Sequence, residues 1–165
     1  MKSKLFFKHL IFDNHLFILI CFLILSISIT LLLNLSIVKF FVPIIGGLLS
    51  LLYFIQKQKL AELLLFRELF NDFNSKYDKL NNGLLIIINN SNNKLSDDEK
   101  SLLLKYFNLC SEEYLYYRKG YIFQEVWNTW FKGMNIYYEN ARIRRFWNKE
   151  LKSESYYGLE KLFKY

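Results

Sequence analysis

Residues 16–33 read LFILICFLILSISITLLL, eighteen consecutive positions without a charged side chain. As an α-helix, which rises about 1.5 Å per residue, this segment is roughly 27 Å long and matches the hydrocarbon core of a bilayer. Its few polar members are small, and a hydroxyl can donate a hydrogen bond to a carbonyl one turn back in its own helix. The alternative is a buried helix of a soluble protein, but an uncharged run of this length is typical of a membrane span. We therefore predict a first transmembrane helix here.

A second apolar run, IVKFFVPIIGGLLSLLYFI at residues 37–55, carries one charge, Lys39, close enough to its end to reach the lipid headgroups. Gly46 and Ser50 lie four positions apart and form a small-residue face on which another helix can pack closely. That face serves either packing within the chain or, as the second alternative, dimerisation. Only three residues separate the two runs, so the sequence predicts an antiparallel hairpin of spans at about 16–35 and 37–55.

Positive charges indicate how this hairpin is oriented. The positive-inside rule assigns the ends that are rich in lysine and arginine to the cytoplasm. The turn side holds only Lys39, whereas the two outer ends hold Lys2, Lys4, Lys8, Lys57, Lys59 and Arg67. We therefore predict that both termini are cytoplasmic, that residues 1–56 form the N-terminal segment and hairpin, and that residues 57–165 form a cytoplasmic domain.

The chain after residue 55 has the pattern of amphipathic helices. Between residues 63 and 87, apolar side chains recur at alternating steps of three and four, which is the seam of a helix packed in a bundle. The members of this seam are Leu63, Phe66, Phe70, Phe73, Tyr77, Leu80, Leu84 and Ile87. Neither proline nor glycine occurs between Gly47 and Gly83, so the second span can continue into this helix without a break.

Local signals divide the remaining residues into further helices. NNSNNK at residues 89–94 predicts a loop, and Ser96 followed by Glu99 forms a capping box that starts the next helix. The other expected elements are a stop at Lys119 and Gly120, a helix at about 123–139, a basic helix at about 141–151 and one last turn in the tail. The predicted fold class is all-α, with a two-helix transmembrane hairpin followed by a cytoplasmic bundle of about four helices.

The composition excludes several classes of protein. Hydrophobic residues make up 53% of the 165 positions and aromatic residues 19%, far more than a disordered chain contains. The formal net charge is +7, but residues 56–165 contribute only +4, from 18 basic and 14 acidic residues. A net charge of only +4 is weak evidence for a surface that binds nucleic acid, and contact with anionic lipid explains the basic residues more simply. The expected partners are the bilayer and a protein or a second copy of the chain, not a nucleic acid.

Residues that catalysis or metal binding requires are scarce. The histidines, His9 and His15, flank the start of the first span, and the cysteines Cys21 and Cys110 fall in the membrane and on an apolar helix face. Serine or cysteine triads, zinc sites and phosphate-binding loops are therefore not predicted. We expect a protein that is not an enzyme, with no catalytic, cofactor-binding or metal-binding residues and no cofactor.

Glu112 and Glu113 are adjacent, so on a helix their side chains point about 100° apart and cannot form a paired-carboxylate site. We expect one of them to form a buried ion pair with an arginine of the last helix. Catalysis is the alternative, and it would require one of these glutamates to lie in a true pocket with an altered pKa.

Two further groups are candidates for binding. Trp127, Trp130, Met134 and Tyr137 recur at helical spacing, which is more often a core stripe than a ligand cage. Exposed aromatic side chains favour interfaces, and the candidates for a protein-interaction surface are Tyr116, Tyr121, Trp127 and Trp130. The candidates for contact with anionic lipid are Arg142, Arg144, Arg145 and Lys149; a solvated face paired with nearby glutamates is the alternative.

Four aromatic-rich stretches in the second half of the chain are distinctive. They are FNLCSEEYLYYRKGYI (107–122), VWNTWFKGM (126–134), IRRFW (143–147) and SYYGL (155–159). They lie within residues 107–159, about a third of the chain, and resemble a group of small bacterial proteins of unknown function. Those proteins pair one or two N-terminal spans with a helical domain. The resemblance implies a helical protein anchored in the bacterial inner membrane, and it brings no activity and no catalytic residues.

The expected function is that of a membrane-anchored cytoplasmic interaction or scaffold module with no chemistry of its own. The alternative is a two-span effector of the defence or toxin type, which would oligomerise through Gly46 and Ser50 and depolarise the membrane. That alternative rests on an analogy of layout. Neither span has a charged or strongly polar stripe that would suit the lining of a pore.

Overall fold

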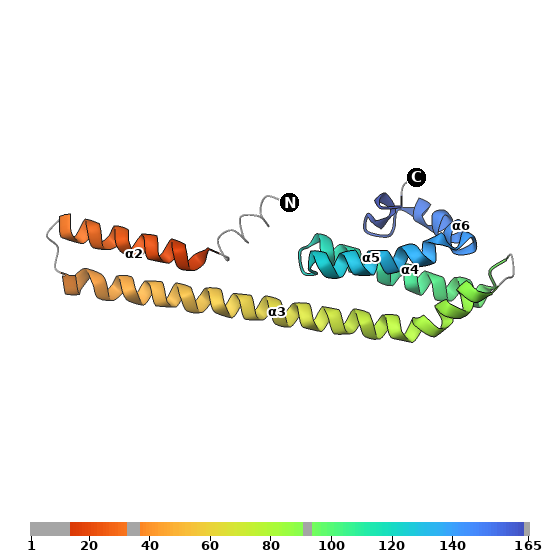
Figure 1. Cartoon of the computed structure of the whole chain (residues 1–165), viewed down its shortest axis with the longest axis horizontal. Helices are drawn as coiled ribbons and strands as arrows, with labels where there is room; N and C mark the ends of the chain where they lie inside the picture. Colours follow the sequence, from red (N-terminus) through yellow and green to blue (C-terminus); the bar gives the residue numbers. More distant parts are fainter. Residues whose placement is uncertain (1–13, 33–36, 91–93, 164–165) are drawn as a thin grey trace. The chain divides into compact units, whose positions relative to one another are not determined.

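The computed structural model describes residues 14–32, 37–90 and 94–163, with residues 37–39 described as backbone only. Within these residues the chain is all-helical, as the sequence predicts. Its elements are α2 (His15–Leu32), α3 (Ile37–Asn89), α4 (Asp97–Arg118), α5 (Gln124–Glu139), α6 (Ala141–Glu150) and the 3₁₀ turns η1 (Leu151–Ser153) and η2 (Leu159–Lys161). Figure 1 follows them along the chain, from α2 in red to α6 in blue. They belong to two compact units, residues 1–63 and 64–165.

The first unit contains two apolar helices, α2 and the beginning of α3, which run side by side (Figure 1). Both are long and apolar enough to cross a membrane. Large apolar side chains cover their outside, and Phe17, Leu32 and Tyr53 are among the most exposed. Length and composition therefore agree with two spans. The turn predicted at residues 34–36, the side chain of Lys39 and the lysines before residue 14 lie outside the described part of the chain.

The hydroxyl groups of these two helices are satisfied internally. The side chains of Ser26, Ser28, Thr30 and Ser50 each donate a hydrogen bond to the carbonyl four residues earlier, over 2.6 to 2.9 Å. This is the pattern predicted from the sequence, and it leaves no hydroxyl proton on these side chains that lipid would have to solvate.

Gly46 and Ser50 do not lie between α2 and α3. Both are exposed, and a Cβ added at Gly46 would meet no atom within 4 Å. The groove shared by the two helices is lined instead by leucine and isoleucine, namely Leu16, Leu19, Ile20, Leu23, Ile45, Leu48, Leu49 and Leu52. In the described residues of the first unit, the small-residue face is therefore open.

Helix α3 runs without interruption past Pro43 to Asn89, and the boundary between the two units falls inside it. From residue 66 onward, the predicted seam faces the core of the second unit, with Phe73, Leu84 and Ile87 buried. Leu63, the predicted first member of the seam, is exposed and belongs to the first unit. The seam is therefore one residue shorter at its start than the pattern indicates.

Helix α4 begins and ends at the predicted signals. The Ser96 hydroxyl accepts a hydrogen bond from the Glu99 amide (3.2 Å), and the Glu99 carboxylate accepts one from the Ser96 amide (2.7 Å). Both halves of the capping box are thus present. After Arg118 the chain turns through Gly120, whose φ of 81° is favourable for glycine. The two following helices lie within one residue of their predicted bounds.

The core of the second unit is largely aromatic. Trp147 is completely buried, with its ring 4.2 Å from that of Phe107 and 4.8 Å from that of Phe163, centroid to centroid. Phe163 comes from the C-terminal tail, which is fixed by a hydrogen bond from the Arg118 guanidinium to the Tyr157 carbonyl (2.7 Å). The predicted last turn of the tail is present as η2, and Leu159 and Phe163 bury it in the core.

A buried cluster of polar groups joins the end of α3, the beginning of α4 and the beginning of α6. Arg142 is 8% exposed, and one of its terminal nitrogens donates to both carboxylate oxygens of Glu99, at 3.0 and 3.1 Å. Its other terminal nitrogen donates to the carbonyl of Asn90, whose side-chain amide in turn donates to Glu99 (3.0 Å). Burial disfavours the charged form of Glu99, but the hydrogen bonds from Ser96, Asn90 and Arg142 outweigh it, so the pKa of Glu99 is lowered.

Replacement of Arg142 by methionine should lower the free energy of unfolding by about 3 kcal/mol at pH 7, because the Glu99 carboxylate then lies buried without its cation. Arg144→Met is the matched control; this exposed side chain should change stability by less than about 0.5 kcal/mol. Thermal unfolding of the full chain in detergent, followed by near-ultraviolet circular dichroism, measures both.

The same pair predicts acid sensitivity. Since the pKa of Glu99 is lowered from 4.5 on folding, its contribution to stability is complete above pH 4.5 and is lost as the pH falls through the folded-state pKa. The difference in the free energy of unfolding between Arg142→Met and Arg144→Met should therefore become smaller in acid. An equal loss of stability in both variants at pH 7 would contradict the buried pairing of Arg142 with Glu99.

Candidate functional site

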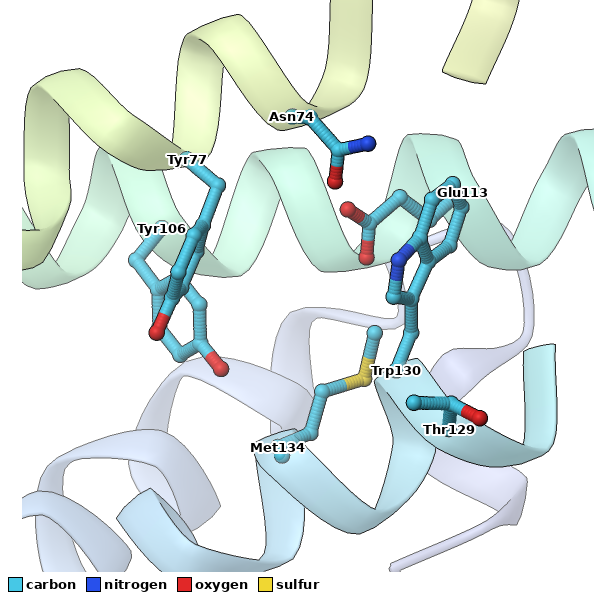
Figure 2. A pocket seen from close by; sticks show the side chains of 8 residues that line it. Asn74, Tyr77, Tyr106, Glu113, Thr129, Trp130 and Met134 are labelled. Atoms are coloured by element: carbon cyan, nitrogen blue, oxygen red, sulfur yellow. The ribbon is translucent and has the colours of Figure 1, made fainter. Parts of the chain in front are cut away.

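A cavity of about 210 Å³ lies within the second unit, between α3, α4 and α5 (Figure 2). Its walls are mainly aromatic and apolar, and they include one carboxyl group. The lining residues are Asn74 and Tyr77 from α3, Tyr106 and Glu113 from α4, and Thr129, Trp130, Gly133 and Met134 from α5. Cavities of this kind, apolar with a few converging polar groups, are the usual form of a small-molecule site.

Helical periodicity explains why these residues meet. Tyr106 and Glu113 are seven positions apart, two turns of α4, and therefore share a face. Asn74 and Tyr77 are separated by three positions of α3, which also places them on one face. Three helices that turn these faces toward each other enclose a common space.

Glu113 is the unusual member of this lining. It is 6% exposed, and in the part of the chain that the structure describes no hydrogen bond or ion pair reaches its carboxyl group. Burial, together with the nearby charge of Glu112, raises the pKa of Glu113 to about 8. At neutral pH the cavity therefore contains a mostly protonated carboxylic acid.

Glu112 lies on a different side of α4, as the 100° step between neighbours predicts. Its carboxylate is half-exposed and 3.4 Å from the ammonium group of Lys76, which is also 2.9 Å from the carboxylate of Asp72. The hydrogen bond that Lys76 donates to the Asp72 carboxylate raises the pKa of Lys76 most; burial partly opposes this, and the charge of Glu112 raises the pKa further. The two adjacent glutamates thus have opposite environments.

We expected Glu112 or Glu113 to form a buried ion pair with an arginine of the last helix, and the structure pairs that arginine with a different glutamate. Arg142 does make a buried pair, but its partner is Glu99. The physical reason is distance along α4, because Glu99 and Glu113 are separated by fourteen residues, or roughly 21 Å. Arg142 at the start of α6 lies beside the beginning of α4, and this position leaves Glu113 without a cation.

Burial disfavours the ionised form of three other groups near the cavity. It raises the pKa of Tyr137, whose hydroxyl is 2.9 Å from that of Tyr77. Burial also raises the pKa of Tyr106 and of the fully buried Cys110. The Cys110 thiolate, which would be the reactive form, is therefore disfavoured at neutral pH.

The structure separates the four aromatic candidates for a protein-interaction surface. Trp127 is 5% exposed and stacks on Tyr117 at a ring distance of 5.0 Å, so it belongs to the core. Trp130 is partly buried and lines the cavity, and Tyr116 is partly buried beside Phe73. Tyr121, with 43% of its surface accessible, is the one exposed side chain of the four.

The basic candidates are also divided. Arg142 is buried and paired with Glu99, so its assignment to a lipid-contacting surface is wrong. The first residues of α6 turn toward the core, and the guanidinium therefore points inward rather than to solvent. Arg144, Arg145 and Lys149 are exposed. Among the described residues, no group of three or more histidine, cysteine, aspartate or glutamate side chains is placed to hold a metal ion.

No family model, curated protein or solved structure matches this chain. The resemblance of its aromatic-rich stretches to small bacterial membrane proteins stays a prediction. Function must therefore be argued from the chain's own site.

Replacement of Glu113 by glutamine should stabilise the protein at neutral pH. Between the unfolded pKa of 4.5 and the folded value of about 8, the folded chain keeps a proton that the unfolded chain releases, so wild-type stability falls as pH rises through this window. The variant escapes this loss, which amounts to on the order of 3 kcal/mol at pH 7 and vanishes near pH 4.

Unfolding curves at several pH values measure this effect, and Glu112→Gln is the matched control because its carboxylate is half-exposed. A difference between wild type and Glu113→Gln that does not change with pH would show that Glu113 is ionised in the folded protein.

Proposed function

We propose that this chain is a membrane-anchored helical interaction module without chemistry of its own, with its first unit in the lipid of the bacterial inner membrane and its second unit in the cytoplasm. The observation that carries the proposal is the exposure of apolar side chains along α2 and the beginning of α3. In water, such a surface would be costly to hydrate, whereas lipid solvates it well. The back-bonded hydroxyls of these helices support the same assignment.

The second unit supports a binding role. It has its own aromatic core and presents exposed apolar side chains near the start of α5, where Tyr121 and Phe123 follow each other closely. Tyrosine and phenylalanine are enriched at protein interfaces. We propose that a protein partner, or a second copy of the chain, binds this surface. The exposed Arg144, Arg145 and Lys149 would add attraction to anionic headgroups.

A second candidate is the two-span effector that depolarises the membrane. It is favoured by one observation, the open face at Gly46 and Ser50, on which a helix of another copy could pack. A potential-sensitive dye tests it in cells that overproduce the chain, since an unchanged membrane potential would exclude this candidate.

Membrane anchoring predicts that an arginine in α2 weakens insertion. Ile24→Arg should release a large fraction of the chain from the membrane, because a charge near the middle of a span costs about 2.5–3.5 kcal/mol on insertion scales. Ile136→Arg is the matched control, since Ile136 is exposed to a similar degree but lies on α5 of the second unit. Extraction of membranes with alkaline carbonate measures the bound fraction, and equal release of both variants would contradict the anchor.

The interaction surface predicts a cross-linked complex in intact membranes. Tyr121→Ala should reduce its yield several-fold, because truncation of an exposed tyrosine at an interface removes a large contact area. Ile136→Ala serves as the control for a general effect of trimming an exposed apolar side chain. Recovery of the monomer alone, under conditions that cross-link known membrane complexes, would count against the module.

A further inference from the structure

The cavity around Glu113 is not explained by anchoring or by the surface at Tyr121. We infer that it binds a small organic monocation, such as a primary ammonium with a short apolar tail, whose charge pairs with the Glu113 carboxylate. The inference concerns residues of the second unit only, and it does not depend on where the first unit lies.

Two glutamates of this unit, Glu99 and Glu113, have contrasting surroundings. Glu99 is surrounded by donors from Ser96, Asn90 and Arg142. Glu113 is at least as deeply buried and has none in the described residues. The Glu113 carboxyl group has no partner among the described residues and lines the cavity, and titratable groups with an altered pKa in clefts cluster at functional sites. The partner that this chain does not supply would come from a ligand.

The walls of the cavity suit a cation with an apolar tail. In Figure 2 the carboxyl group of Glu113 points into the space that the side chains of Asn74, Trp130 and Met134 surround. Aromatic rings attract cations through their negative faces, and Trp130, Tyr77 and Tyr106 all line the cavity. The Asn74 side chain carries an oxygen that can accept a further hydrogen bond from an ammonium group (Figure 2).

The donor set does not suit a metal ion. The lining includes a single carboxyl group, which is too few charged oxygen ligands for Ca²⁺ or Mg²⁺. Gly133 occupies the middle of α5, where alanine would favour the helix more, and a Cβ there would meet no atom within 4 Å. The absent side chain leaves room at the wall for an apolar tail.

Binding of a cation should displace a proton from the cavity. The titratable groups that line the cavity with Glu113 are Tyr106 on α4 and Tyr77 on α3; Glu112 and Cys110 on α4 interact with Glu113 electrostatically, and Lys76 is engaged by Glu112 and Asp72. Because the pKa of Glu113 is about 8, ligand binding below that pH exchanges a proton for the cation. Affinity should therefore rise about tenfold from pH 6 to pH 7 and level off above pH 8.

Titration of the full chain in detergent with n-butylammonium tests the inference, with butan-1-ol as the uncharged ligand of similar size. We expect calorimetric binding of the ammonium, release of nearly one proton at pH 7 as judged from two buffers of different ionisation enthalpy, and no comparable binding of the alcohol. Equal binding of the two ligands, or no binding of the ammonium up to pH 9, would overturn the proposal.

Two variants locate the site. Glu113→Gln should weaken ammonium binding at least tenfold and abolish proton release, whereas the control Glu112→Gln should stay within about twofold of wild type, because a half-exposed charge contributes little. Gly133→Leu should also abolish binding by filling the cavity. Near-ultraviolet circular dichroism confirms that each variant is folded. An equal loss of ammonium affinity in Glu113→Gln and Glu112→Gln, or wild-type affinity in Gly133→Leu, would show that the ammonium does not bind in this cavity.

Discussion

The contact in which one terminal nitrogen of Arg142 donates to both Glu99 carboxylate oxygens is the constraint on which the second unit depends. It joins three helix ends in one buried cluster: the Asn90 carbonyl just after α3, the cap of α4 and the first turn of α6. Because every donor in this cluster has a defined direction, the three helix ends have little freedom to shift relative to each other. The aromatic core, which has few directional contacts of its own, packs within that frame. The position of Arg142 also explains why Glu113, fourteen residues further along α4, is left without a cation.

Much of the fold could be predicted because its signals are local. The apolar runs, the capping box at Ser96, the glycine stop at Gly120 and the seam of α3 each depend on neighbouring residues in the sequence. The partner of Arg142 could not be found this way, since the two residues are 43 positions apart and several acidic residues were equally plausible. Its burial had no sequence signal either, because Arg142, Arg144 and Arg145 look alike in a basic helix.

The candidate site was predictable only in part. Sequence periodicity separates Glu112 from Glu113 by 100° but does not say which one faces inward, since that depends on how α4 is rotated against α3 and α5. The same limit applies to Trp127 and Trp130, of which the first lies in the core and the second lines the cavity. Gly133, a helix-disfavouring residue between Trp130 and Met134, is a sequence signal of the cavity. Asn74 beside the apolar seam is another.

The complete burial of Cys110 has a practical consequence for the dynamics of this unit. A thiol that is enclosed in the native state reacts with an alkylating reagent only during excursions that expose it, so its rate of modification reports how often the surrounding helices separate. Cys21, which is exposed on α2, has no such protection from the protein. The chain thus contains two intrinsic chemical reporters. The thiol of Cys110 reports transient opening of the aromatic core, and the thiol of Cys21 reports the solvent or lipid around α2.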